Sequence, residues 1–240
     1  MVDINLGRAC SVRMIIALVV IILSSCSYQG GNEQPVIRKF TWFSYVAAED
    51  IRKNCNSANN SQYRFVYNGI YNEQVRTYDV SQIGKGRYRI KINVTEEADI
   101  SSIEFHLDDI DLFRPWRPKT SVTHVSTKEI NMLNKALTDL GFFDSPLPSI
   151  NLSSISFYWV VSSCIDGEFQ QNAYLWPEEE FKKAAFPKFL SMWDYTDIPI
   201  NPPRETSDFS IYGTAETISI RNHFNLKFGG NGLLGHNLLN

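Results

Sequence analysis

Alternating apolar and polar positions mark the first half of the chain as a series of β-strands. The clearest case is residues 87–94, where large apolar side chains alternate with charged or polar ones over eight positions. Strict alternation of this kind predicts a strand with one buried and one solvated face. Similar or less regular patterns predict strands at residues 63–67, 75–80 and 103–107, with a turn at residues 84–86. Together they indicate an antiparallel meander.

A β-hairpin is predicted between residues 155 and 176. Its centre, Asp166-Gly167, has the composition of a two-residue type I′ turn, in which both positions need a positive φ. Pairing outward from this turn predicts three cross-strand pairs: Trp159 with Tyr174, Phe157 with Trp176, and Cys164 with Phe169. The large aromatic side chains then share one face, and we interpret them as core rather than as a ligand platform.

One amphipathic helix is predicted between Ser126 and Gly141. Ser126 and Glu129 have the spacing of a capping box, and Gly141 stands where a left-handed residue commonly ends a helix. Apolar residues recur between them at helical spacing, so this helix is expected to lie on the sheet. Two shorter helical pieces are predicted after Pro177, because Pro187 must end or restart the helix that Pro177 opens.

These elements predict an α+β fold: mainly an antiparallel sheet, made of a meander and a hairpin, with two or three short helices packed on it. We place a single globular domain at residues 40–228, beginning with a short helix at residues 46–53. Further short strands are predicted at residues 209–212, 217–221 and 224–228. Residues 229–240 are rich in Gly and Asn and are expected to form a flexible tail.

The amino terminus has the pattern of an export signal. Residues 14–23 are ten apolar residues in a row, which as a helix would cover roughly 15 Å, about half of a hydrocarbon core. The run is therefore too short to span a membrane, and Arg8 and Arg13 supply the positive flank of a signal peptide. It is followed by the tetrapeptide LSSC at residues 23–26, which resembles the lipobox of bacterial lipoprotein precursors.

This resemblance covers about the first 27 residues and implies a lipid anchor. In that class of precursors the cysteine receives the lipid and becomes the first residue of the mature chain. The resemblance therefore implies that Cys26 carries the acyl chains and that residues 1–25 are a signal peptide. Ser27 after the cysteine implies the outer membrane, facing the periplasm, in a cell with two membranes. An ordinary secretory signal with an incidental cysteine is the alternative.

Residues 27–34 are small and polar, so we place a flexible tether at residues 26–39.

The composition of the chain excludes several classes of protein. The 240 residues are 43% hydrophobic and 20% charged, with a net charge of −3. These values exclude a disordered chain, a collagen-like repeat and a multi-pass membrane protein. The near-neutral charge gives no support to nucleic-acid binding, so no nucleic-acid partner is expected.

Of the four cysteines, two are expected to form a disulfide. Cys10 leaves with the signal peptide and Cys26 is assigned to lipid, so Cys55 and Cys164 remain. Two cysteines in an exported domain usually pair, because the compartment is oxidising. No histidine lies near either of them in the sequence, which disfavours a catalytic thiol. We therefore predict a Cys55–Cys164 disulfide.

The common catalytic and cofactor motifs are missing from the sequence. It contains no GxSxG, HExxH or CxxC, no glycine-rich phosphate loop and no EF-hand spacing, and no cofactor is expected. The candidate metal ligands are His106, Asp108, Asp109 and Asp111. Carboxylates bind hard cations, but an acidic, solvated strand end is the alternative interpretation of this cluster.

Charge is unevenly distributed along the predicted meander. Residues 38–91 carry ten basic residues against four acidic ones, whereas residues 92–111 carry seven acids and no Lys or Arg. A basic face would suit an anionic envelope glycan or a lipid headgroup. The tyrosines expected near that face are Tyr63, Tyr67, Tyr71, Tyr78 and Tyr88. Neutralisation between neighbouring strands is the alternative.

The sequence as a whole favours a non-enzymatic, lipid-anchored envelope protein that binds or scaffolds a partner such as an envelope protein or a glycan. Trp116 lies among Arg and Pro residues and is expected to be exposed, which makes it the candidate contact residue. One alternative is a small envelope hydrolase or metal-dependent enzyme that uses the cluster at residues 106–111. Another is an assembly accessory that pairs through an exposed strand edge.

Overall fold

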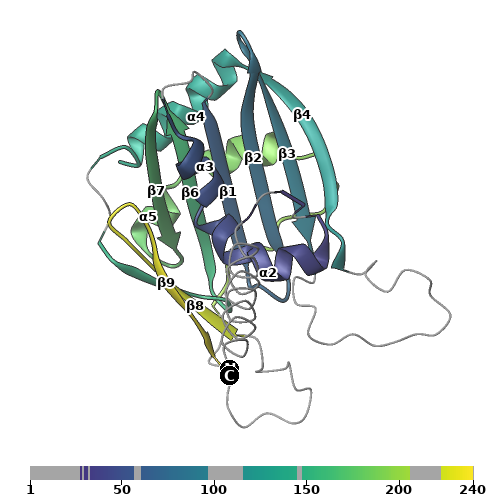
Figure 1. Ribbon diagram of the computed structural model, residues 1–240, viewed down its shortest axis with the longest axis vertical. Coiled ribbons are helices and arrows are strands. Elements are labelled where there is room, and N and C mark those ends of the chain that lie inside the picture. The colour runs from purple at the N-terminus through teal and green to yellow at the C-terminus, as the bar shows by residue number, and fades with distance from the viewer. Residues whose placement is uncertain are drawn as a thin grey trace, which may run out of the picture.

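Two antiparallel sheets and five short helices make up the described structure, an α+β fold as the sequence predicts (Figure 1). The computed structural model describes residues 28, 30–31, 33–56, 61–96, 116–144, 148–205 and 223–239. The helices are α2 (Pro35–Val46), α3 (Glu49–Asn54), α4 (Thr127–Asp139), α5 (Glu179–Lys183) and α6 (Phe186–Met192). The strands are β1 (Gln62–Gly69), β2 (Val75–Gly84), β3 (Arg87–Thr95), β4 (Lys119–Ser126), β5 (Ile150–Ser153), β6 (Phe157–Ile165), β7 (Glu168–Leu175), β8 (His223–Gly229) and β9 (Gly232–Leu239).

The larger sheet has the strand order β4-β3-β2-β1-β6-β7, and each neighbouring pair is antiparallel. Strands β1 to β4 form a meander, and the hairpin β6–β7 joins the sheet alongside β1. Asp166 and Gly167 have φ values of 53° and 84°, as a type I′ turn requires. The predicted register is confirmed for its three pairs: Trp159 with Tyr174, Phe157 with Trp176, and Cys164 with Phe169.

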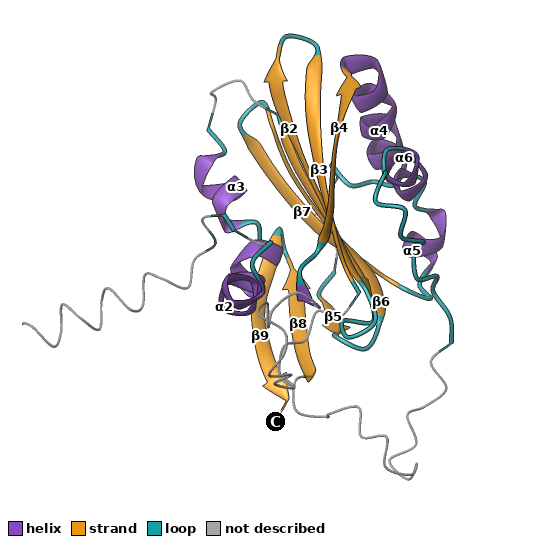
Figure 2. Ribbon diagram, turned by 90° about the vertical axis from the view of Figure 1, so that its right-hand side faces the viewer, coloured by secondary structure: helices purple, strands orange, loops and turns teal. Residues whose placement is uncertain are grey.

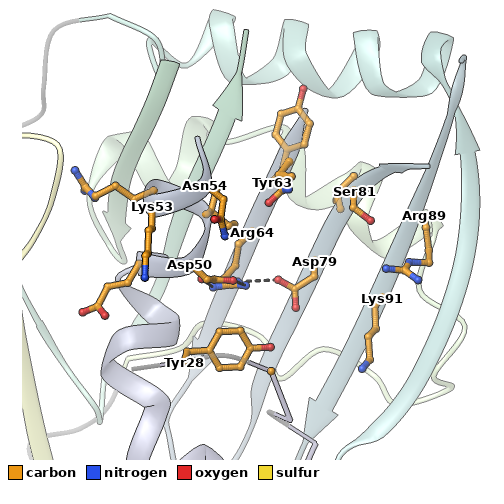
Figure 3. Close-up of a pocket in the computed structure, with 16 residues that line it drawn as sticks. Tyr28, Asp50, Lys53, Asn54, Tyr63, Arg64, Asp79, Ser81, Arg89 and Lys91 are labelled. Carbon is orange, nitrogen blue, oxygen red and sulfur yellow. Dashed lines mark hydrogen bonds and ion pairs between the residues drawn. The ribbon is translucent and has the colours of Figure 1, made fainter. Parts of the chain in front are cut away.

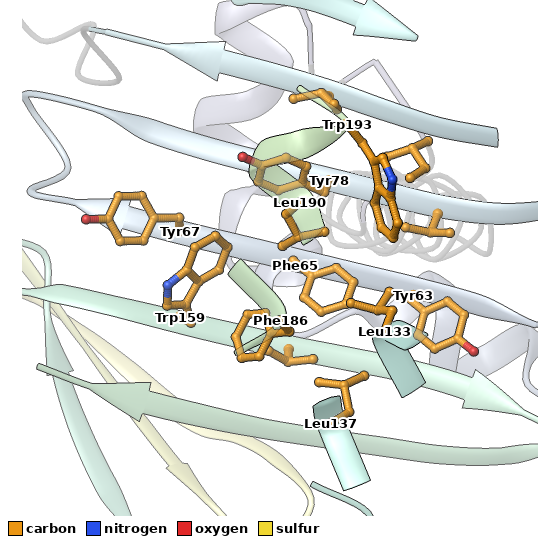
Figure 4. Close-up of a cluster of buried hydrophobic side chains, with 14 of the residues drawn as sticks. Tyr63, Phe65, Tyr67, Tyr78, Leu133, Leu137, Trp159, Phe186, Leu190 and Trp193 are labelled. Atoms are coloured by element: carbon orange, nitrogen blue, oxygen red, sulfur yellow. The ribbon is translucent and has the colours of Figure 1, made fainter. Parts of the chain in front are cut away.

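One face of this sheet carries the main hydrophobic core, which α4, α5 and α6 cover (Figure 2). Tyr63, Phe65 and Tyr67 of β1 are at most 1% exposed. They belong to one buried cluster with Leu133 and Leu137 of α4 (Figure 4). The capping box that begins α4 is present as predicted, and the aromatic residues of the hairpin are core.

The opposite face of the sheet is covered by α2, α3 and the smaller sheet, which has the order β5-β8-β9 (Figure 2). Trp42 and Tyr45 of α2 form a second buried cluster with Val66 and Tyr158 of the large sheet and Leu226 of β8. Successive residues of a strand point to opposite faces, so the same strands supply both cores. The second core therefore holds α2 and β8 on the same side of the large sheet.

The amino-terminal helix begins earlier than the sequence pattern predicts. Residues 35–39 are assigned above to a flexible tether, but α2 already begins at Pro35. Proline suits the first turn of a helix, because its φ is already helical and its missing N–H needs no partner. Arg38 then donates hydrogen bonds to the Thr95 hydroxyl at 3.2 Å and to the Trp116 carbonyl at 2.8 Å. Tertiary contacts therefore order a segment whose sequence resembles a linker.

Two strands carry no clear sequence signal. The expectation of a flexible tail at residues 229–240 is wrong, because Gly232–Leu239 forms β9 and pairs with β8. Strand β4 pairs with β3 but exposes most of its side chains, so its sequence lacks an apolar period. Both strands depend on a neighbour for their hydrogen bonds. The strands predicted at residues 103–107, 209–212 and 217–221 lie outside the described residues.

The predicted disulfide joins Cys55 and Cys164. Cys55 directly follows α3, and Cys164 lies on β6 opposite Gln62 of β1. The bond closes a sequence separation of 109 residues and holds the two Cα atoms 5.6 Å apart. It therefore ties the end of α3 to the sheet.

Removal of this disulfide should destabilise the fold. Replacing both Cys55 and Cys164 by Ala should lower the free energy of unfolding by about 2–5 kcal/mol, because the unfolded chain regains the entropy of a long loop. Guanidinium unfolding followed by circular dichroism measures the change. A reductant should destabilise the natural chain by a similar amount and leave the double variant unaffected. An equal response of the two proteins to the reductant would contradict the bond.

Candidate functional site

The groove beside α3 is built around the side chain of Arg64, which is 4% exposed in the middle of β1. Two of its guanidinium nitrogens donate to the two carboxylate oxygens of Asp50 on α3, at 2.7 and 2.8 Å. Its Nε donates to Asp79 on β2 at 2.7 Å, and one Nη also donates to the Tyr45 carbonyl at 3.0 Å. One cation therefore joins α2, α3, β1 and β2.

Two tyrosine rings enclose the same guanidinium. Its central carbon lies 3.8 Å from the ring centre of Tyr45 and 5.1 Å from that of Tyr28. The two rings meet edge to face, with their centres 4.7 Å apart. The backbone N–H of Tyr28 donates to Ser44 Oγ at 2.8 Å, which holds this part of the chain on α2. Tyr28 is thus part of the folded domain, inside the segment expected to be a flexible tether.

Burial and neighbouring charges set the protonation states of these groups. Burial by itself disfavours the charged form of Arg64, but the negative charges of Asp79 and Asp50 outweigh burial and hold the pKa of the guanidinium well above its usual value. Burial and the charge of Asp79 together raise the pKa of Tyr28 to about 12. The guanidinium is therefore always charged, and the Tyr28 hydroxyl is neutral at physiological pH.

Around this centre lies an open groove with a volume of about 940 Å³. Lys53 of α3 lies on one side of Arg64, and Arg89 and Lys91 of β3 lie on the other (Figure 3). Lys91 pairs with Glu33, and burial lowers the pKa of Lys91. Among the described residues, Lys53 and Arg89 have no hydrogen-bond or ion-pair partner. The two sides of the groove therefore carry positive charge that the described residues do not neutralise.

The uneven charge distribution of the sequence has two outcomes in the fold. Arg64 is neutralised by Asp50 and by Asp79 of the neighbouring strand, whereas no residue in the described part of the chain neutralises Arg89. The tyrosine side chains pack in the cores, although Tyr63 also borders the groove, because alternate residues of a strand point to opposite sides. The main core on the other face of the sheet contains Tyr63, Tyr67, Tyr78 and Tyr88, and Tyr71 packs against the second core.

The other candidate residues from the sequence do not belong to this groove. Trp116 is 6% exposed, so the expectation of an exposed contact residue is wrong. Its carbonyl is held by the buried side chain of Arg38, which fixes this part of the chain against α2. The remaining candidate residues lie outside the described part of the chain; they are Cys26, His106, Asp108, Asp109 and Asp111. The described residues contain no group of three or more His, Cys, Asp or Glu that could hold a metal ion.

Sequence reasoning missed the cluster of Asp50, Arg64 and Asp79. One signal was present: Arg64 stands between Tyr63 and Phe65 in a strand that is otherwise largely apolar. A buried arginine needs a counter-charge, because an unpaired charge is costly to remove from water. The identity of that counter-charge depends on register, since Arg64 lies opposite Asp79 in the β1–β2 pairing.

The groove is chemically suited to hold an anion. The donors of Arg64 face Asp50, Asp79 and the Tyr45 carbonyl, so this side chain forms the floor rather than a binding group. No described residue occupies the charged groups of Lys53 and Arg89. A guanidinium matches the geometry of phosphate or carboxylate oxygens, and an ammonium adds a point charge.

Comparisons with known proteins do not place the chain in a family: no protein-family model, no curated protein and no solved structure matches it. Within the described ranges, no helix combines the length and the apolar character needed to cross a bilayer.

Loss of the central cation should be far more costly than loss of an exposed one. Arg64→Gln should lower the free energy of unfolding by about 2–4 kcal/mol, because two carboxylates, each about a quarter exposed (26% and 27%), lose their counter-charge. The matched control is Arg204→Gln, which removes an exposed ion pair with Glu73 and should cost at most about 1 kcal/mol. Urea unfolding of both variants measures the difference. Equal losses would contradict the central role of Arg64.

Alkaline pH should unfold the protein. Burial raises the pKa of Tyr28 and of Tyr63 from 10.0 to about 12 in each case, so the unfolded chain releases these protons at lower pH than the folded chain. Their contribution to stability is therefore complete below about pH 10 and is lost as the pH rises toward about 12. Tyrosinate absorbance and circular dichroism, recorded together across this range, measure the effect. Tyr28→Phe should make the loss shallower, and an identical loss in this variant would contradict the assignment to Tyr28.

Proposed function

We propose that this chain is a lipid-anchored protein of the cell envelope whose folded domain binds a negatively charged component of that envelope. The lipobox resemblance at residues 23–26 supports the anchor on Cys26. The disulfide between Cys55 and Cys164 supports export, because disulfides persist in oxidising compartments. An outer-membrane position facing the periplasm is the location that Ser27 favours.

The groove beside Arg64 is the observation that carries the binding function. It is open, its volume is about 940 Å³, and Lys53 and Arg89 have no counter-charge among the described residues. Structural ion pairs neutralise each other, as Arg64 does with Asp50 and Asp79. Cations that stay unpaired in a concave site instead raise the local concentration of anions. This supports a binding module rather than a catalyst as the role of the domain.

The anchor can be tested by metabolic labelling with an alkyne analogue of palmitate in a bacterial host. The natural chain should take up the label, and Cys26→Ala should lose it completely, because no thiol remains at the lipobox position. The matched control is Cys10→Ala, which removes a cysteine of the proposed signal peptide and should keep the label. Labelled Cys26→Ala protein would overturn the proposed anchor.

A further inference from the structure

We infer that the groove faces the membrane that carries the anchor, and that Lys53 and Arg89 bind the phosphate groups of anionic phospholipids there. This inference rests on the proposed function, since it needs the acyl chains on Cys26. It adds the identity of the ligand and the orientation of the domain on the membrane.

The proposed anchor on Cys26 lies close to the groove in the sequence. Tyr28 lines the groove and is the second residue after Cys26. Two residues of fully extended chain span at most about 7 Å. Tyr28 is also fixed, because its backbone N–H is bound by Ser44 and its ring packs on Tyr45. An acylated Cys26 therefore keeps Tyr28, and with it the groove, close to the headgroup layer.

The groove carries an excess of positive charge. Its lining contains five basic and three acidic residues. The acids are engaged: Arg64 binds Asp50 and Asp79, and Glu49 accepts a hydrogen bond from the Ser44 hydroxyl. Arg52 is also engaged, because its guanidinium donates to the Asn231 carbonyl and lies 4.1 Å from the ring centre of Phe169. Lys53 and Arg89 have no partner within the described ranges, and we infer that they meet the anion.

The arrangement of the cations favours a lipid headgroup as the anion. The cations stand on two sides of an open groove, with Arg64 and its carboxylates between them (Figure 3). Such an arrangement fits a layer of separate phosphates better than one enclosed ion. Each basic side chain near an anionic surface gains modest attraction. The anchor makes this attraction effective, because it raises the local concentration of headgroups around the groove.

The experiment uses the mature, lipidated chain in lipid nanodiscs. A water-soluble acylating reagent modifies exposed lysines, and mass spectrometry reports the modification of each lysine. In discs that contain phosphatidylglycerol, Lys53 should be modified about fivefold more slowly than in discs of phosphatidylcholine alone. The internal control is Lys183, which is exposed on α5 across the sheet and should react equally in both. Equal reactivity of Lys53 in both kinds of disc would overturn the inference.

Two variants and one competitor complete the test. Arg89→Gln should remove most of the phosphatidylglycerol-dependent protection of Lys53, whereas Lys183→Gln should leave it unchanged. Inorganic phosphate added to phosphatidylcholine discs should give no comparable protection, and full protection by phosphate would overturn the choice of a lipid headgroup. The mass of the purified chain reports lipidation separately. A lipidated chain without protection overturns this inference alone, whereas a chain without acyl groups overturns the proposed function.

Discussion

The guanidinium of Arg64 is almost completely removed from water, and Asp50 and Asp79 offset the cost of burying its charge. This requirement determines the arrangement of the whole corner of the fold. Asp50 can reach the arginine only if α3 lies against β1, and Asp79 only if β2 pairs with β1 in the observed register. Tyr45 closes the site from α2 with its ring and its carbonyl. Four elements are thus positioned by one buried charge.

The disulfide and the arginine act on the same short helix from different ends. Helix α3 has only six residues, which is too short to be stable alone in water. Asp50 fixes its first turn to Arg64, and Cys55 fixes the chain that follows it to Cys164 on β6. Lys53 lies between these two attachments. An ion pair and a disulfide therefore both hold the helix that carries Lys53, although the Lys53 side chain itself is exposed.

The amino-terminal segment connects the groove to the proposed anchor. Tyr28 packs on Tyr45 and over Arg64, so the folded domain begins very near the lipobox cysteine rather than after a long tether. A long tether would let the domain sample many orientations above a membrane. With the proposed anchor on Cys26, two residues before Tyr28, one orientation is favoured, with the basic groove toward the headgroups. The binding and the anchoring that we propose are therefore two consequences of one arrangement.

Features that depend on local rules can be predicted from the amino-acid sequence alone. These are the type I′ turn at Asp166, the capping box at Ser126, the alternation of β3, and the pairing of Cys55 with Cys164 once Cys10 and Cys26 are assigned to the signal peptide and the lipid. Strands β4 and β9 follow only from the folded arrangement, because each forms its hydrogen bonds with a neighbouring strand. The folded arrangement alone decided the candidate site as well. Asp50, Arg64 and Asp79 are distant in the chain, and register and packing determine which charges meet.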